Sequence, residues 1–117
     1  MLRLWRAAIN SGRGLRFAFR SEQAFREEAA ALLLGVPLAL LIGTTPERRI
    51  ELVVVLLMLM VIELLNTAIE KLSDRLTRED DFQIRAVKDM SSAAVGIMVV
   101  IAAMVWVFAI AERLGVV

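Results

Sequence analysis

Three apolar stretches, separated by charged residues, dominate the pattern of hydrophobic and polar positions along this chain. They cover residues 29–43, 50–70 and 93–111. A helix rises about 1.5 Å per residue, so the second and third stretches would be about 30 Å long, which matches the hydrocarbon core of a bilayer. The first is shorter and contains Pro37, so it needs flanking apolar residues or packing against neighbouring helices. The pattern predicts three transmembrane helices, over residues 29–43, 47–75 and 82–113.

Composition supports a lipid environment and narrows the possible chemistry. Hydrophobic residues make up 59% of the 117 positions, and the mean hydropathy is +0.70, more than a soluble domain of this size can bury. The chain contains no Cys and no His. Disulfides, thiol nucleophiles, Cys/His zinc sites and Ser-His-Asp triads are therefore excluded. A net charge of +1 argues against a nucleic-acid partner.

The N-terminal residues 1–28 are expected to form an amphipathic surface helix, because Leu2, Trp5, Ile9, Leu15 and Phe19 share one arc of a helix. Residues 1–28 hold six Lys or Arg, residues 71–90 hold five, and the remaining three lie near the other ends of the spans. Loops rich in Lys and Arg stay in the cytoplasm. The N-terminus and the loop after the second span are therefore predicted to be cytoplasmic.

Two helix starts can be predicted from local signals. Thr45 is a good N-cap, Pro46 suits the first helical position, and Glu47 places an acid in the first turn. A tight hairpin is therefore expected between the first two spans. Asp80, with Gln83 three residues later, is the predicted cap of the last helix, which would begin in water and then enter the lipid.

A polar stripe runs along the second span. Glu63, Asn66, Thr67, Glu70 and Asp74 fall on one helical face. An ionisable residue inside a bilayer costs several kcal/mol, so a function is the default interpretation of Glu63. The alternative is a polar seam that joins helices through hydrogen bonds, but such a seam seldom needs two glutamates.

Two acids at different depths suit the phosphorylation of a lipid. A buried carboxylate can accept a hydroxyl proton, whereas an interfacial one can hold a divalent cation. Lys88 and Asp89, with Asp80 and Asp81, would face a soluble phosphate donor at the cytoplasmic surface. The sequence has neither a GxxxxGK[ST] loop nor a kinase-type glycine loop, so a nucleotide site would be built from acid-held Mg²⁺ and scattered basic residues.

Three blocks of sequence carry a resemblance to a known family. Residues 60–70 (MVIELLNTAIE), followed by Asp74 and Arg75, resemble the E-x-L-N-(S/T)-A-I-E signature of the small bacterial diacylglycerol kinases. Residues 86–95 (AVKDMSSAAV) resemble their second signature, and residues 14–16 (GLR) with 22–28 (EQAFREE) are similar to their N-terminal segment. The blocks occur in family order across nearly the whole chain.

The resemblance implies a fold and an activity. The fold is an all-α membrane protein, with an N-terminal amphipathic surface helix plus three transmembrane helices, assembled as a homotrimer. The activity is transfer of the γ-phosphoryl group of MgATP to the hydroxyl of diacylglycerol, which gives phosphatidic acid. A trimer also fits the size of the chain, because three short helices cannot enclose a site for both ATP and a lipid.

The resemblance also implies roles for individual residues. Glu63 would be the catalytic base, and Glu22 and Glu70 the Mg²⁺ ligands. The implied ATP-binding residues are Arg3, Asn10, Glu22, Glu70, Glu79, Asp80, Asp81, Lys88 and Asp89. The implied substrate-binding or supporting residues are Arg3, Glu28, Asn66 and Ser92.

Two alternatives stay open at this point. An undecaprenol kinase of the same family would share both signatures, although Glu28 and residues 88–95 favour diacylglycerol. A small proton-coupled transporter would also use an acid inside the membrane, but exporters of this length usually need four spans. For the kinase, the expected location is the bacterial cytoplasmic (inner) membrane, as a multi-pass protein with its N-terminus and active site on the cytoplasmic side.

Overall fold

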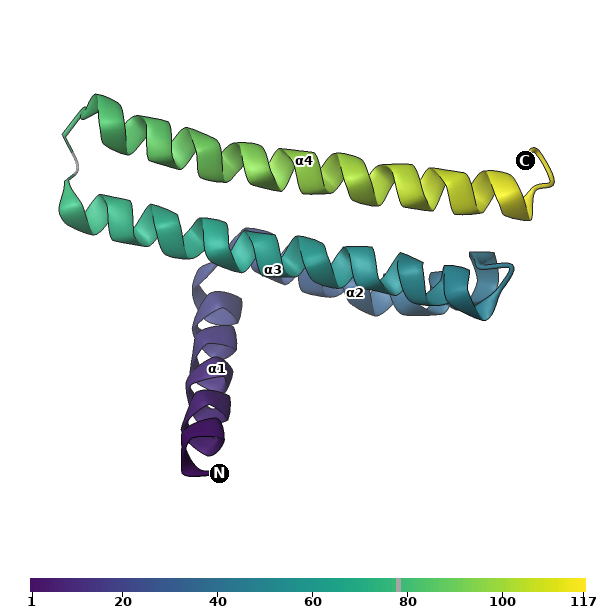
Figure 1. Cartoon of the computed structure of the whole chain (residues 1–117), viewed down its shortest axis with the longest axis horizontal. Helices are drawn as coiled ribbons and strands as arrows, with labels where there is room; N and C mark the ends of the chain where they lie inside the picture. Colours follow the sequence, from purple (N-terminus) through teal and green to yellow (C-terminus); the bar gives the residue numbers. More distant parts are fainter. Residues whose placement is uncertain (78) are drawn as a thin grey trace.

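The computed structural model of the chain describes residues 1–77 and 79–117. Its helices, in chain order, are α1 (Leu2–Ser21), α2 (Gln23–Ile42), α3 (Pro46–Leu76) and α4 (Phe82–Arg113), as Figure 1 shows. The expected all-α fold is confirmed. Arg78, one of the basic residues counted in the predicted cytoplasmic loop, lies outside the described residues.

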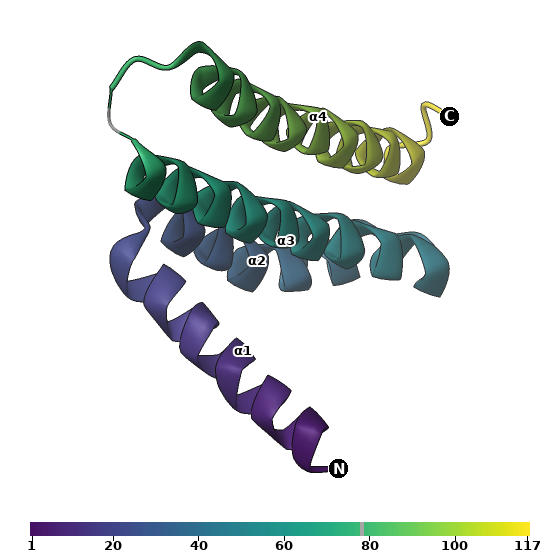
Figure 2. The same cartoon turned by 60° about the vertical axis from the view of Figure 1, so that its left-hand side comes forward.

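The two longest helices form an antiparallel hairpin. Helices α3 and α4 lie side by side along their whole length, and α2 packs against α3 (Figure 1). Helix α1 leaves the bundle near the start of α2 and projects away from α3 and α4 (Figure 2). Within the described residues, α3 and α4 are the helices long and apolar enough to cross a membrane. The predicted first span, over residues 29–43, overlaps α2 and stays a prediction.

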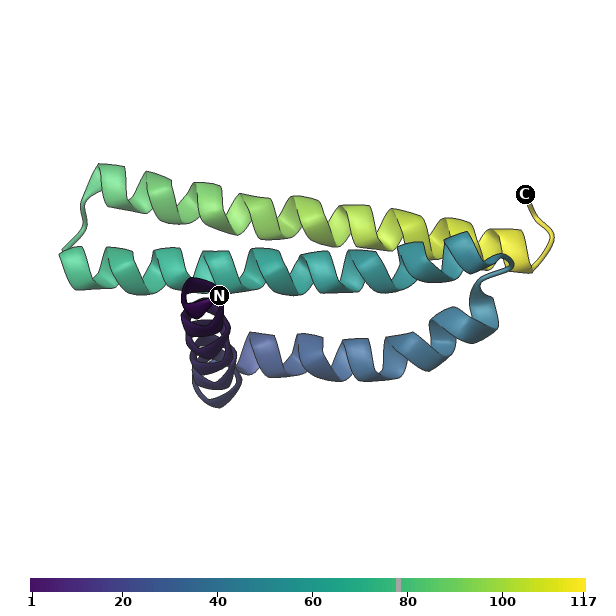
Figure 3. The same cartoon turned by 60° about the horizontal axis from the view of Figure 1, so that its bottom comes forward.

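Residue Glu22 separates α1 from α2. Its backbone is extended, with φ −119° and ψ 114°, so the chain turns there and not near residue 28, where the surface helix was expected to end. Arg26 explains the turn, because its Nη1 donates hydrogen bonds to the carbonyls of Phe19 (3.0 Å) and Arg20 (3.1 Å). These carbonyls belong to the last turn of α1, where no intrahelical partner exists. Pro37 lies inside α2, which bends toward α3 in its second half (Figure 3).

The two predicted helix caps had different outcomes. Thr45 is the N-cap of α3, and its hydroxyl oxygen accepts a hydrogen bond from the Arg48 amide at 3.1 Å, so this prediction is confirmed. The Asp80 cap was wrong. Helix α4 begins at Phe82, so Asp81 occupies the N-cap position, where its Oδ1 accepts hydrogen bonds from the amides of residues 83 and 84. Asp80 instead forms an ion pair with Arg85 at 3.0 Å.

Small residues hold the three bundle helices together. The buried core consists of two clusters, one of Ala39, Leu52 and Ala109 and one of Val55, Met98 and Ala102. Alanine at such contacts lets helix backbones approach closely. Trp106 adds a tie between helices, because its indole N–H donates a hydrogen bond to the Leu52 carbonyl at 3.2 Å. Most other large apolar side chains of α3 and α4 face outward, which suits contact with lipid or with other membrane helices.

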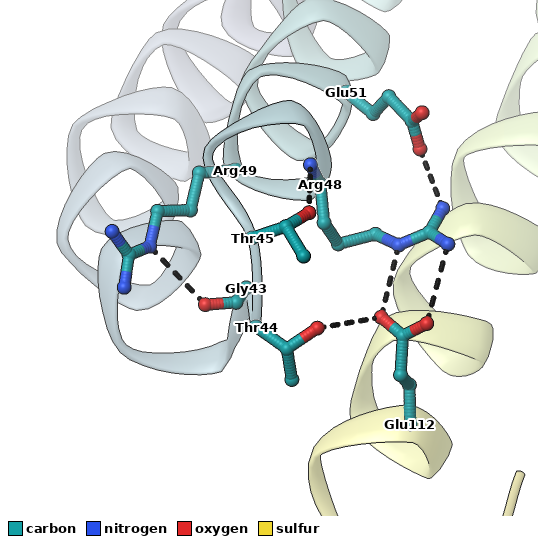
Figure 4. Close-up of polar contacts among 7 residues, drawn as sticks. All are labelled: Gly43, Thr44, Thr45, Arg48, Arg49, Glu51 and Glu112. Carbon is teal, nitrogen blue, oxygen red and sulfur yellow. Dashed lines mark hydrogen bonds and ion pairs between the residues drawn. The ribbon is translucent and has the colours of Figure 1, made fainter.

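A polar network fastens the far end of the hairpin (Figure 4). Glu112 near the end of α4 accepts hydrogen bonds from Arg48 Nε at 3.1 Å and from the Thr44 hydroxyl at 2.9 Å. Arg48 also pairs with Glu51, and its guanidinium lies 4.8 Å from the centre of the Phe108 ring. The network therefore connects the start of α3 to the end of α4, at the opposite end of the bundle from residues 70–77.

The first prediction concerns this network. Glu112→Gln should lower the melting temperature of the protein in detergent by several degrees, because the amide cannot serve as the two-oxygen acceptor that Arg48 and Thr44 share. Glu47→Gln is the matched control, since Glu47 is an exposed acid in the same end of the bundle. Thermal unfolding followed by tryptophan fluorescence measures the difference. Equal melting temperatures for the two variants would show that the network does not stabilise the hairpin.

Candidate active site

The predicted polar stripe of α3 faces the interior of the bundle. Glu63 is 8% exposed, and Asn66 and Thr67 are each 9% exposed. Leu65, on the other side of the same helix, is exposed. The helical periodicity of the sequence therefore places these polar side chains on the correct face. Asp74, at the C-terminal end of the stripe, is exposed and forms an ion pair with Lys88 of α4.

Four carboxylates, from α2, α3 and the junction of α1 and α2, lie close enough to interact. Glu63 of α3 interacts electrostatically with Glu70 on the same helix and with Glu22 at the junction of α1 and α2. Glu28 of α2 interacts with Glu63 in turn. We call Glu22, Glu28, Glu63 and Glu70 the acidic cluster. All four were predicted site residues, and the packing of α2 on α3 brings them together.

One basic side chain partly balances the acidic cluster. Lys71 Nζ lies 3.0 Å from Glu22 Oε1 and 5.2 Å from the centre of the Phe17 ring, so it also joins α3 to the end of α1. The position of Lys71 next to Glu70 was the available signal for this contact. Lys71 and Glu63, which carry opposite charges on α3, thus both interact with Glu22.

Glu28 is the member of the cluster with an unsatisfied atom. Its Oε2 is buried and has no hydrogen-bond partner among the described residues. Glu28 precedes the predicted span of residues 29–43, and burial, followed by the charges of Glu63 and Glu27, raises the pKa of its carboxyl to about 7. Acids that repel one another, with one oxygen unpaired, make an environment that favours a cation.

The donor set fits a magnesium ion. Mg²⁺ in phosphoryl-transfer sites is held by one or two carboxylates together with phosphate oxygens and water. Within the described residues, no three acids are already arranged as a metal-binding group. The acidic cluster offers carboxylate oxygens of the kind that Mg²⁺ takes, and the remaining ligands would come from outside the chain.

A chain of hydrogen bonds crosses from α4 to the acidic cluster. The Ser91 hydroxyl donates to Asn66 Oδ1 at 2.6 Å, and Asn66 Nδ2 donates to Glu70 Oε1 at 3.4 Å. Ser91 is 8% exposed, whereas Ser92, the serine that the resemblance implied, is exposed. Sequence reasoning missed Ser91. Its spacing of three residues from Lys88, which places the two side chains on one face of α4, was the available signal.

A polar cavity of about 400 Å³ lies beside the acidic cluster, where α3 ends and α4 begins. The described residues that line it are Asp74, Thr77, Glu79, Asp80, Asp81, Ile84, Arg85, Lys88 and Asp89. All five predicted ATP-binding residues of this region are therefore brought together. Lys88 links the cavity to the cluster, because its Nζ lies 2.6 Å from Asp74 Oδ1 and it interacts electrostatically with Glu70.

Two predicted ATP-binding residues lie elsewhere. Arg3 and Asn10 are exposed on α1, which projects away from α3 and α4, the helices that flank the cavity (Figures 1 and 2). The predicted residues therefore fall into the acidic cluster and the cavity lining, with Asn66 beside Glu70, whereas Arg3 and Asn10 on α1 and the exposed Ser92 lie outside both groups.

Comparison with known proteins identifies the family of this chain. The model of the prokaryotic diacylglycerol kinase family matches residues 9–110. The chain belongs to this family. A diacylglycerol kinase of Escherichia coli is 36% identical over 113 residues, which cover 97% of this chain and 93% of the relative. The diacylglycerol kinases of Haemophilus influenzae and Pseudomonas aeruginosa are 37% and 33% identical over 80% of this chain, and the matches cover 79% and 76% of their own lengths. The resemblance seen in the sequence is therefore confirmed.

Proposed function

We propose that this chain transfers the γ-phosphoryl group of MgATP to the hydroxyl of diacylglycerol and releases phosphatidic acid and ADP. Membership of the prokaryotic diacylglycerol kinase family supports a kinase that acts on a lipid alcohol, and curated relatives with that name cover nearly the whole chain. Neither the undecaprenol alternative nor the transporter alternative is favoured by these relatives. The observation that carries the proposal is the buried carboxylate of Glu63 within the acidic cluster, beside a polar cavity that opens at the end of the bundle.

Glu63 is the proposed catalytic base. The lipid hydroxyl approaches through the membrane, and Glu63 accepts its proton as the hydroxyl oxygen bonds to the γ-phosphorus of ATP. The bond between that phosphorus and the β,γ-bridging oxygen breaks, and ADP leaves. Positioning and charge stabilisation account for most of the rate of such transfers, because there is little covalent chemistry for the protein to perform. The burial of Glu63 also keeps bulk water away from the reacting oxygen.

Glu22 and Glu70 are the proposed ligands of the magnesium ion that accompanies ATP. When bound, the ion neutralises charge that develops on the phosphate oxygens. Glu22 has Lys71 as its partner in the structure, so nucleotide binding exchanges that ion pair for a metal contact. Glu28, Asn66 and Ser92 are the proposed supporting residues on the lipid side, and Asn66 already contacts Glu70.

The polar cavity is the proposed binding region for the nucleotide phosphates. Lys88 would exchange its partner Asp74 for a phosphate, and Asp89 with the acids of residues 79–81 would shape the entrance. Arg3 and Asn10 stay predicted nucleotide contacts. Because they lie far from the cavity along α1, they can reach it only after α1 changes its orientation or from another protomer.

The proposed assembly is a homotrimer in the bacterial inner membrane, in which residues 29–43 form the first span beside α3 and α4. The outward-facing apolar side chains of α4, such as Val100, Met104 and Val107, support contact with lipid or with a second copy. The N-terminus and the loop between α3 and α4 would face the cytoplasm, because these segments carry most Lys and Arg and because ATP is available on that side.

A detergent-micelle assay with two lipids tests the proposed function. Purified protein should phosphorylate diacylglycerol in the presence of MgATP, and it should do so faster than it phosphorylates undecaprenol in a parallel reaction. Product formation can be followed with labelled ATP and lipid extraction, and Glu63→Gln serves as the negative control. Turnover of undecaprenol alone would replace the lipid in the proposal. Turnover of neither lipid by a folded protein would end the kinase assignment.

A further inference from the structure

Ser91 of α4 is a buried polar residue to which the proposed mechanism assigns no role. We propose that Ser91 is a positioning residue, which fixes the orientation of the Asn66 amide and thereby holds Glu70 ready for the metal. This inference rests on the proposed role of Glu70 as a magnesium ligand. Its evidence is the hydrogen-bond chain from α4 to α3, which no local sequence motif encodes.

The geometry gives the Asn66 amide one favourable orientation. The Ser91 hydroxyl donates to Asn66 Oδ1 at 2.6 Å, so the amide nitrogen is turned toward Glu70, where it donates to Oε1 at 3.4 Å. With the amide flipped, its oxygen would face the Glu70 carboxylate, and two acceptors would then repel each other. Asn66 and Ser91 are both buried, so water cannot easily replace either partner.

The hydrogen bond from Ser91 to Asn66 is short and the one from Asn66 to Glu70 is long, and a long hydrogen bond suits a carboxylate that must also bind a metal. The long contact from Asn66 to Glu70 restrains the carboxylate without neutralising it, and it engages Oε1 only. Glu70 is half-buried, and Oε2 is left for another ligand. Ser91 therefore acts through Asn66 and has no contact with Glu70 of its own.

Helix α4 carries both Lys88 and Ser91. Lys88 lies three residues before Ser91 and reaches α3 through Asp74, whereas Ser91 reaches α3 through Asn66. The phosphate-binding lysine and the group that orients the metal ligand are therefore on one rigid helix. The register of α4 against α3 therefore determines the positions of both side chains.

Metal binding without turnover provides the first readout. Wild-type protein and Ser91→Ala would be compared in detergent micelles with Mn²⁺ as the spectroscopic probe, a non-hydrolysable ATP analogue and electron paramagnetic resonance. Ser91→Ala should weaken Mn²⁺ binding by about three- to tenfold, the range expected for the loss of one buried hydrogen bond. The Mg²⁺ concentration for half-maximal kinase activity should rise by the same factor. Ser91→Thr keeps the hydroxyl and should restore most of both values.

The matched control is Ser73→Ala. Ser73 is also a buried serine near the end of α3, and its hydroxyl makes no hydrogen bond within the described part of the chain. This variant should bind Mn²⁺ like the wild type. If Ser73→Ala and Ser91→Ala weaken binding equally, the effect comes from repacking and the positioning role is wrong.

A double-mutant comparison covers the case in which Ser91→Ala loses stability. In an Asn66→Ala background, Ser91→Ala should have no further effect on Mn²⁺ binding, because the residue through which it acts is absent. Additive losses would overturn the inference. Unchanged Mn²⁺ affinity in a folded Ser91→Ala variant would overturn it as well. Failure of the wild type to phosphorylate diacylglycerol would instead overturn the proposed function, so the two failures are distinguishable.

Discussion

Glu63→Gln is expected to reduce turnover by roughly 10²- to 10⁴-fold, the usual cost of losing a general base. The amide keeps the shape of the side chain and can still hydrogen-bond, but it cannot accept the hydroxyl proton. Removing one of several mutually repelling acids from a buried position should leave the melting temperature level or raise it. Turnover at saturating lipid and MgATP, measured beside thermal unfolding of the same preparation, provides the test.

The combination of the two readouts separates a catalytic from a structural Glu63. A structural role would reduce activity only as far as the assembly falls apart, so activity and melting temperature would decline together. Glu27→Gln is the matched control, because Glu27 is an exposed acid next to Glu28 and should tolerate the change. Near-normal turnover in Glu63→Gln would exclude it as the base.

Glu22→Gln and Glu70→Gln are each expected to raise the Mg²⁺ concentration for half-maximal activity by at least about tenfold, the lower end of what the loss of even an outer-shell partner costs. Each variant removes a charged oxygen donor from the acidic cluster while the bundle helices stay packed. Titration with Mg²⁺ at saturating ATP and lipid measures the shift.

Lys71→Met provides the contrast for the metal prediction. It removes the partner of Glu22 and leaves both carboxylates in place, so it should not raise the Mg²⁺ requirement. The ligand assignment is wrong if Glu22→Gln and Glu70→Gln both titrate like the wild type. Gel filtration of all three variants in detergent checks that the assembly is intact.

Features set by local sequence could be predicted. The start of α3 depends on Thr45, Pro46 and the following residues, and these signals act within one turn. The buried stripe of α3 follows from helical periodicity, so Glu63 and Asn66 were placed correctly. The N-cap of α4 was assigned one residue early, because Asp80 and Asp81 are both good caps and only the position of the first turn decides between them.

Features set by contacts between helices could not be predicted. Ser91 and Ser92 are adjacent and differ by about 100° in direction, so the register of α4 against α3 decides which one reaches Asn66. Arg48 and Glu112 are 64 residues apart and meet only because the two helices have matching lengths. The turn at Glu22 contains no Gly or Pro that would predict it. It depends instead on the side chain of Arg26, four residues later, which donates hydrogen bonds to the end of α1.

Glu22, the extended residue between α1 and α2, links the predicted surface helix to the proposed active site. Glu22 joins the amphipathic α1 to α2 and is also a predicted metal ligand, so a change in the tilt of α1 would rotate the backbone that carries this carboxylate. The depth of such a helix depends on lipid composition and curvature. The occupancy of the proposed metal site should therefore differ between a flat bilayer and a strongly curved micelle, and the packing of the surrounding lipid would then influence the rate of phosphoryl transfer.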